Sequence, residues 1–127
     1  MFESTALVLR ALVILWVVDL VVSLKGFPSL RRLLVRVRPI ALFSSRYTPA
    51  EIARLCEYSF IAYFRSIRCL QRAATLALTL RLYGYPASLI VGTRSFPFYS
   101  HSWVEVGGIS LEVDQQLVES LRELDRC

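Results

Sequence analysis

Apolar residues follow a helical spacing through the first two-thirds of the chain and a strand-like spacing in the last third. Up to about residue 83 they recur every three or four positions, whereas beyond residue 86 they form short runs or alternate with polar residues. Helices followed by a small antiparallel sheet predict an α+β fold. The elements expected are helices over 5–26, 29–38, 49–65, 69–83 and 115–124, and strands over 87–92, 101–106 and 109–114.

The first helix is the most apolar segment. Residues 6–24 are nearly long enough to span a bilayer, but Arg10 and Asp19 interrupt the run, and each is costly at the bilayer centre. No small-x-small cleavage site follows, which argues against a signal peptide. We therefore favour a helix buried in the domain or against a partner over membrane association.

Start and stop signals define several helix ends. Ser4 or Thr5 can cap the first helix. "TPAE" predicts a capping box between Thr48 and Glu51, and Gly84 should end the helix over 69–83. The residues expected on buried helix faces are Ile52, Leu55, Cys56, Ser59 or Phe60, Tyr63, Leu70, Ala73, Ala74, Ala77 and Leu78.

Composition narrows the class of partner. The 127 residues fit one domain, with an N-terminal helical part over 1–48 and the core over 49–127. The net charge of +5 favours acidic partners, and the 55% hydrophobic content favours an interaction surface. Nucleic acid is disfavoured, and we expect neither a metal site nor a cofactor, because no RNA-binding motif, zinc-finger spacing or phosphate loop is present. Three cysteines without disulfide or CxxC spacing indicate a reducing, cytoplasmic compartment.

The single histidine lies in a predicted hairpin. If Gly107 and Gly108 form a two-residue turn, which requires positive φ, the strand register follows directly. The opposite pairs are Val106 with Ile109, Glu105 with Ser110, Trp103 with Glu112, and His101 with Asp114. A carboxylate would then hold one nitrogen of the His101 ring. The alternative is an ordinary hairpin whose polar residues share one face, and a longer turn would shift the register.

An oriented imidazole needs a nucleophile to activate, and Cys69 is the best candidate. It stands at a predicted helix start, where backbone N–H groups and the helix dipole favour a thiolate and could bind an oxyanion. Arg68 and Arg72 add positive charge nearby. Cys56 is expected to be a buried, inert thiol and Cys127 to be frayed, while the alternative for Cys69 is a small core residue.

These residues match a family pattern. "CLQRAATLALTLRLYGYPASLIVG", then "SHSWVEV" and "LEVD", resemble the transglutaminase-like fold, a circularly rearranged relative of papain. More narrowly, "RCLQR" and "GTRSFPFYSHSWVEV" (92–106) resemble the leader peptidases of lasso-peptide biosynthesis. The resemblance covers about residues 65–124. It implies a papain-like core in which a nucleophile at a helix start packs on the sheet.

The resemblance assigns roles to particular residues. Cys69 would be the nucleophile, His101 the general base and acid, and Asp114 the residue that orients the ring. The "SLEVD" segment departs from the "N-D" pair of many relatives, so Glu112 is an alternative that the register disfavours. Further assignments are Trp103 as a wall of the site, Arg72 as a structural or substrate contact, and Arg94, Pro97 and Phe98 as residues that order the preceding loop.

The implied activity is hydrolysis of one peptide bond in a ribosomally made lasso-peptide precursor. The first 48 residues show no winged-helix strand pattern, so a separate small leader-binding protein is expected. An ATP-dependent macrolactam cyclase would act on the released core peptide. The alternatives are transamidation by the same fold, and a non-catalytic or membrane-associated binding module on the same scaffold.

Overall fold

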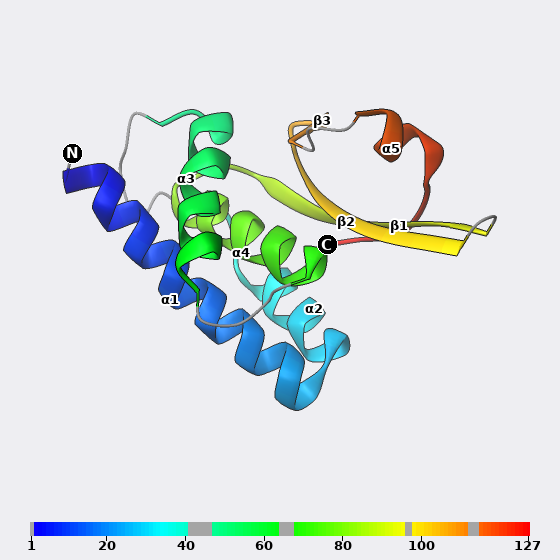
Figure 1. Ribbon diagram of the computed structural model, residues 1–127, viewed down its shortest axis with the longest axis horizontal. Coiled ribbons are helices and arrows are strands. Elements are labelled where there is room, and N and C mark those ends of the chain that lie inside the picture. Colours follow the sequence, from blue (N-terminus) through cyan, green and yellow to red (C-terminus); the bar gives the residue numbers. More distant parts are fainter. Residues whose placement is uncertain (1, 41–46, 64–67, 96–97, 112–114) are drawn as a thin grey trace.

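A computed structural model describes residues 2–40, 47–63, 68–95, 98–111 and 115–127, and it is an α+β protein. Figure 1 shows helices α1 to α4 gathered on one side and the sheet with α5 on the other. The helices are α1 Phe2–Lys25, α2 Phe27–Arg36, α3 Pro49–Ala62, α4 Cys69–Leu82 and α5 Gln115–Ser120. The strands are β1 Ala87–Ser95, β2 Phe98–Val106, β3 Ile109–Ser110 and β4 Arg122–Arg126.

Helix α1 packs on each of the other three helices of the helical layer, α2, α3 and α4. It begins at Phe2, so the predicted cap Ser4 lies inside the helix, where its hydroxyl is hydrogen-bonded to the Tyr47 hydroxyl at 2.6 Å. A stripe at helical spacing has no exposed surface at all. The stripe consists of Leu7, Ala11, Leu15 and Val18.

The two charges of α1 contact tyrosines of other segments. Arg10 Nη1 donates to the Tyr83 hydroxyl at 3.0 Å, and the Tyr63 hydroxyl donates to Asp19 Oδ2 at 2.8 Å. Asp19 is only 4% exposed, so this hydrogen bond compensates part of the cost of burying a carboxylate. Both charges that interrupt the apolar run therefore help to hold the helices together.

The outward side of α1 is apolar as well. Within the described residues α1 is long and apolar enough to cross a membrane, and 28% of that stretch is buried in the domain. A surface helix normally turns polar residues outward, and α1 departs from this rule. The exposed large side chains are Leu9, Val13, Trp16, Val17, Leu20 and Leu24. Whether a partner protein or a membrane contacts this side of α1 stays a prediction.

The predicted capping box starts α3. Glu51 N donates to Thr48 Oγ1 at 3.2 Å, and Thr48 N donates to Glu51 Oε1 at 3.1 Å. The predicted end of this helix at residue 65 lies outside the described residues, and α3 itself ends at Ala62. Of the expected core positions, Ile52, Cys56, Ser59 and Phe60 are buried, while Leu55 and Tyr63 are half-buried.

Helix α4 lies in the middle of the core. It ends at Leu82, and Gly84 follows with φ 91°, as the stop signal predicts. The Arg81 side chain is 7% exposed and donates from Nε to Ala87 O at 2.9 Å and from Nη1 to Leu34 O and Val37 O. Burial lowers the pKa of Arg81. This arginine joins the end of α2 to the start of β1.

The sheet has the strand order β3-β2-β1-β4, and all its neighbouring pairs are antiparallel. Gly107 and Gly108 have φ of 60° and 82°, which fits the primed two-residue turn. Val106 pairs with Ile109, so the predicted turn is confirmed. A hydrogen bond of 2.9 Å from Leu111 N to Val104 O continues the same register. The further predicted pairs involve residues 112–114, outside the described residues.

The segment 93–100, predicted as a loop, is mostly strand. β1 continues to Ser95 and β2 begins at Phe98, so that Thr93 pairs with Ser100 and Arg94 with Tyr99. The β-branched and aromatic side chains of this segment suit a pleated sheet, and the neighbouring strand supplies hydrogen bonds that local sequence cannot reveal. The prediction followed the proline of this segment, and Pro97 itself lies outside the described residues.

The predicted C-terminal helix over 115–124 is only partly right. α5 ends at Ser120, and Arg122–Arg126 form β4 along the free edge of β1. Cys127 continues this pairing, since its N–H donates to Leu89 O at 2.8 Å and its carbonyl accepts from Leu89 N at 2.6 Å. The expectation of a frayed Cys127 was therefore wrong. Unpaired backbone groups on a strand edge favour pairing, and this long-range gain outweighs the weak local helix preference.

Candidate active site

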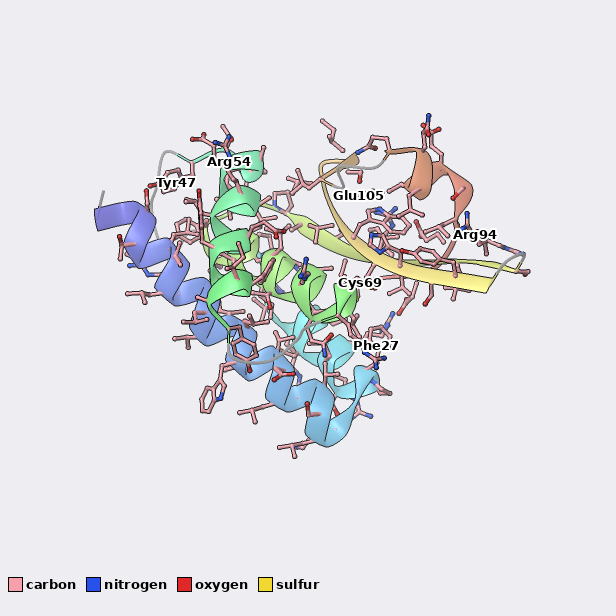
Figure 2. The ribbon with its side chains drawn as sticks, viewed as in Figure 1. Phe27, Tyr47, Arg54, Cys69, Arg94 and Glu105 are labelled. Carbon is pink, nitrogen blue, oxygen red and sulfur yellow. The ribbon has the colours of Figure 1, made fainter. Side chains whose placement is uncertain are left out.

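Cys69 is the first residue of α4, with Arg68 as the N-cap. Its thiol is free and half-buried. Figure 2 shows it on the end of α4 that faces the long strands β1 and β2. The Arg68 side chain makes no capping hydrogen bond, so within the described residues the N-cap side chain leaves the first N–H groups of the helix to other acceptors, such as an anion. This is the local setting in which a thiolate and an oxyanion are stabilised.

The other two thiols lie in different environments. Cys56 has no exposed surface, and burial raises its pKa from 9.0 to about 12, so it remains a neutral thiol at physiological pH. Burial also raises the pKa of Cys127, whose backbone is fixed in the sheet. Among the three cysteines, Cys69 alone stands at the beginning of a helix.

His101 lies on β2, directly opposite Gly92 of β1, and is half-buried. Its ring is stacked between two aromatic rings from the same face of the strand. The ring centroids of Tyr99 and His101 are 6.2 Å apart at an interplanar angle of 24°, and those of His101 and Trp103 are 6.3 Å apart at 21°. The alternation of β2 thus produces a row of three rings with the imidazole in the middle.

Trp103 is 5% exposed and lies over the glycine that faces His101. A Cβ atom at Gly92 would stand 2.7 Å from Trp103 Cη2 and 3.1 Å from Leu121 Cβ. The indole therefore occupies the space that a side chain at position 92 would fill. It lies beside the imidazole, and its role as a wall of the site stays a prediction.

The two arginines singled out from the sequence both lie over aromatic rings. Arg72 Cζ is 5.7 Å from the centroid of the Phe60 ring, a contact between α4 and α3 that supports a structural role. Arg94 Cζ is 5.4 Å from the centroid of the Tyr99 ring. Arg94 Nε is buried without a hydrogen-bond partner among the described residues. Arg94 thus extends the aromatic row at the end distant from Trp103.

The described residues do not complete the predicted triad. Asp114 and its alternative Glu112 lie outside them. No hydrogen bond in the described part of the chain joins the Cys69 thiol to His101. His101 and Val104 are three residues apart on β2, so their side chains point to opposite faces of the sheet. Val104 belongs to the hydrophobic core that also contains Ala74 of α4, and His101 therefore lies on the face that points away from this core. Convergence of the thiol, the imidazole and a carboxylate stays a prediction.

A pocket of about 250 Å³ lies away from Cys69. It opens between the end of α2 and the start of β1, next to Arg81, and so at the opposite end of α4. Its lining contains no cysteine or histidine. Nor does any group of three or more His, Cys, Asp or Glu side chains within the described ranges form a potential metal site.

The family model described as transglutaminase-like superfamily matches residues 14–126, most of the chain. The chain belongs to the transglutaminase-like superfamily. The fold predicted from the residues around Cys69 and His101 is therefore confirmed. Members of this superfamily are typically cysteine proteases or transglutaminases.

The chain is also similar to the microcin J25-processing protein McjB of Escherichia coli. The two sequences are 43% identical over 58 residues, which are 46% of this chain and 27% of the relative. This chain therefore spans only a part of the length of the curated relative that it matches. The predicted resemblance to proteins of lasso-peptide processing is confirmed. No solved structure matches the chain at a significant level.

Proposed function

We propose that this protein is a cysteine peptidase that removes the leader from a lasso-peptide precursor. The observation that carries the proposal is the free, half-buried Cys69 on the first turn of α4, in a transglutaminase-like chain similar to a microcin J25-processing protein. A helix start supports the thiolate that such chemistry requires. The single histidine lies on the strand where this family carries its general base.

In the proposed reaction the Cys69 thiolate attacks the carbonyl carbon at the junction of leader and core peptide. The backbone N–H groups of the α4 start receive the negative charge of the carbonyl oxygen. His101, which has taken the proton of the Cys69 thiol, donates it to the departing amine, and the peptide bond breaks to leave a thioester. His101 then takes a proton from water, whose oxygen attacks the thioester and frees the leader. Asp114 would orient the imidazole, with Glu112 as the alternative.

The proposed partners follow from the same chemistry. The precursor is a peptide, and a separate small protein would hold its leader against the peptidase. An ATP-dependent cyclase would then use the new core amine to close the macrolactam ring. All of these steps are proposed to take place in the cytoplasm. The exposed apolar side of α1 supports the presence of a partner protein in this assembly.

Substitution of the nucleophile tests the proposal. Precursor peptide is incubated with the protein and the leader-binding partner, and the leader and core fragments are followed by mass spectrometry. We expect Cys69→Ala and His101→Ala to abolish cleavage while circular dichroism stays unchanged. Cys127→Ala is the matched control and should cleave normally. Normal cleavage by Cys69→Ala would refute the proposed mechanism.

A further inference from the structure

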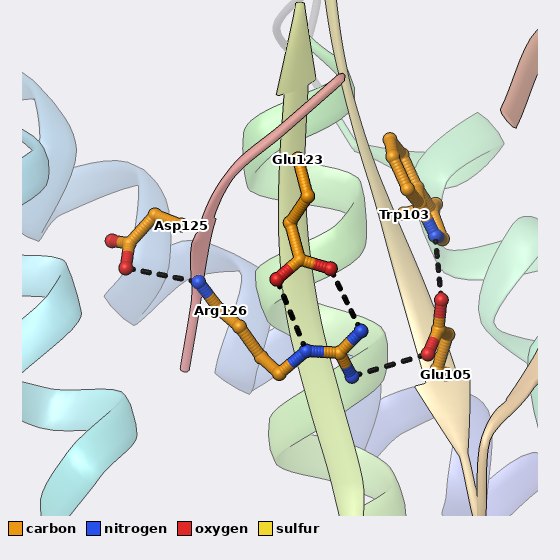
Figure 3. A network of polar contacts seen from close by, with 5 residues as sticks. All are labelled: Trp103, Glu105, Glu123, Asp125 and Arg126. Atoms are coloured by element: carbon orange, nitrogen blue, oxygen red, sulfur yellow. Dashed lines mark hydrogen bonds and ion pairs between the residues drawn. The ribbon is translucent and has the colours of Figure 1, made fainter. Parts of the chain in front are cut away.

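A polar network connects the last strand of the sheet to the row of rings that contains His101. Arg126 Nη1 of β4 donates to Glu105 Oε1 of β2 at 3.1 Å, and the second oxygen of Glu105 accepts from Trp103 Nε1 at 3.3 Å (Figure 3). Arg126 also donates to both oxygens of Glu123, at 2.8 and 3.4 Å. One guanidinium thus joins two carboxylates, and one of these carboxylates holds the indole.

The network spans the strand that lies between its two ends. Ile90 of β1 pairs with Trp103 on one side and with Arg126 on the other, so the three residues form one row across the sheet. Gly92 likewise pairs with both His101 and Glu123. Residues in such a row point to the same face. The side chains of Arg126 and Glu105 therefore meet over β1, on the face that carries the imidazole.

The indole transmits this contact to the histidine. Gly92 has no side chain, so the indole of Trp103 can lie over it, directly across from His101. The indole is also stacked with the imidazole, and the two ring centroids are 6.3 Å apart. A rotation of the indole would therefore open space next to the histidine ring. The packing on Gly92 and the hydrogen bond to Glu105 both restrain that rotation. Arg126 fixes the carboxylate that makes the second of them.

The same network is a weak source of stability. The side chains of Arg126 and Glu105 are 45% and 16% exposed, and ion pairs that are open to solvent contribute little to the free energy of unfolding. The two carboxylates, Glu123 foremost, raise the pKa of Arg126, so it stays charged. A network that spans three strands for little stability is better explained by the geometry that it imposes on Trp103.

We propose that Arg126 is a positioning residue which, through Glu105 and Trp103, holds the His101 ring in the orientation needed for catalysis. The proposal rests on the proposed peptidase function. It means that β4 contributes to the site through the Arg126 side chain. Arg126 itself does not contact the reacting atoms. Its loss should lower kcat, because the imidazole would sample unproductive orientations, and should leave KM nearly unchanged.

The composition of the chain makes the test specific. His101 is the only histidine, so the imidazole nitrogen signals in an NMR spectrum belong to one residue. The chain has two tryptophans, and Trp16 is 52% exposed. In a Trp16→Phe background, fluorescence excited at a wavelength that tyrosine does not absorb therefore reports on Trp103 alone. Both readouts are independent of enzymatic activity.

In that background we expect Arg126→Ala to shift the imidazole signals, to move the Trp103 emission to longer wavelength and to reduce kcat roughly tenfold or more. Arg126→Lys should restore most of both signals, since an ammonium can still reach Glu105. The matched control is Arg122→Ala, which removes the same charge from β4 at a residue outside the network of Arg126, Glu105, Glu123 and Trp103. It should change neither signal.

Two outcomes separate this proposal from the proposed function. If Arg126→Ala leaves the imidazole and indole signals as in Arg122→Ala, the positioning role is refuted, whatever Cys69→Ala does. If Cys69→Ala still cleaves precursor, the peptidase mechanism is refuted, and the two spectra still decide whether Arg126 sets the rings. Should Arg126→Ala not fold, Glu105→Gln removes the ion pair with nearly the same shape, and unchanged signals there would also refute the role.

Discussion

The indole of Trp103 fills the space that a side chain at Gly92 would need, because a methyl group on the glycine would stand 2.7 Å from the indole. This relationship explains a glycine inside a strand, where the residue usually weakens the structure. Gly92 has no positive φ, so the requirement comes from the indole and not from the backbone. The position of the Trp103 ring, and with it the surroundings of His101, thus depends on the absence of a side chain on the neighbouring strand.

Gly92→Ala should accordingly displace the indole and destabilise the protein by about 1–3 kcal/mol, the usual cost of forcing an extra carbon into packed space. Chemical denaturation monitored by fluorescence measures both effects. Adding Trp103→Phe to Gly92→Ala should recover part of the loss, since the smaller ring leaves room for the methyl group. If the double variant is less stable than the sum of the two single variants predicts, this steric explanation is wrong.

The three thiols should differ in their rate of alkylation. Iodoacetamide reacts with thiolates, so Cys69 at the start of α4 should be modified first, Cys127 later, and Cys56 only on unfolding. Peptide mapping by mass spectrometry after short exposures gives the three rates. Equal rates for Cys69 and Cys127 would favour a non-catalytic binding module over the peptidase.

Alkaline pH should destabilise the fold through Cys56. Burial raises the pKa of this thiol from 9.0 to about 12, so between those values the unfolded chain loses a proton that the folded chain retains. The contribution of Cys56 is complete below pH 9 and falls by up to about 1.4 kcal/mol per pH unit as the pH rises towards 12. Urea denaturation at pH 8 and pH 10 measures it, and Cys56→Ala should show a smaller loss. Equal losses in both proteins would contradict the prediction.

Hydrolysis and transamidation by this superfamily can be separated with an added amine. The proposed peptidase should yield mainly the free leader acid when precursor is cleaved in the presence of a small primary amine. Mass spectrometry distinguishes the acid from the leader amide. Predominant amide, formed also from unrelated peptides, would identify the protein as a transamidase.

The parts of the fold that sequence predicts are those with local causes. The capping box of Thr48 and Glu51 depends on residues three positions apart, and the turn at Gly107 and Gly108 depends on a backbone conformation that glycine favours. β4 was missed because its pairing with β1 joins segments about thirty residues apart in the chain. The propensities of neighbouring residues cannot reveal which distant strand a segment will pair with.

The same distinction applies to the site. The position of Cys69 on the first turn of α4 follows from the local pattern, whereas the contact of Arg126 with Glu105 depends on the strand order. A hint was present in the sequence, since Arg126 and Glu123 are three residues apart and of opposite charge, but that spacing equally suits a helix. The orienting role of Asp114 stays a prediction, drawn from the expected register and from the family resemblance.

The tyrosine contacts of α1 limit how the protein can meet a lipid bilayer. For α1 to traverse one, Arg10 would have to leave Tyr83, Asp19 would have to leave Tyr63, and the stripe from Leu7 to Val18 would have to abandon its packing. Insertion and the native fold therefore exclude each other. The folded chain could at most rest upon a bilayer by the outward leucines and valines of α1, with the sheet in the aqueous phase.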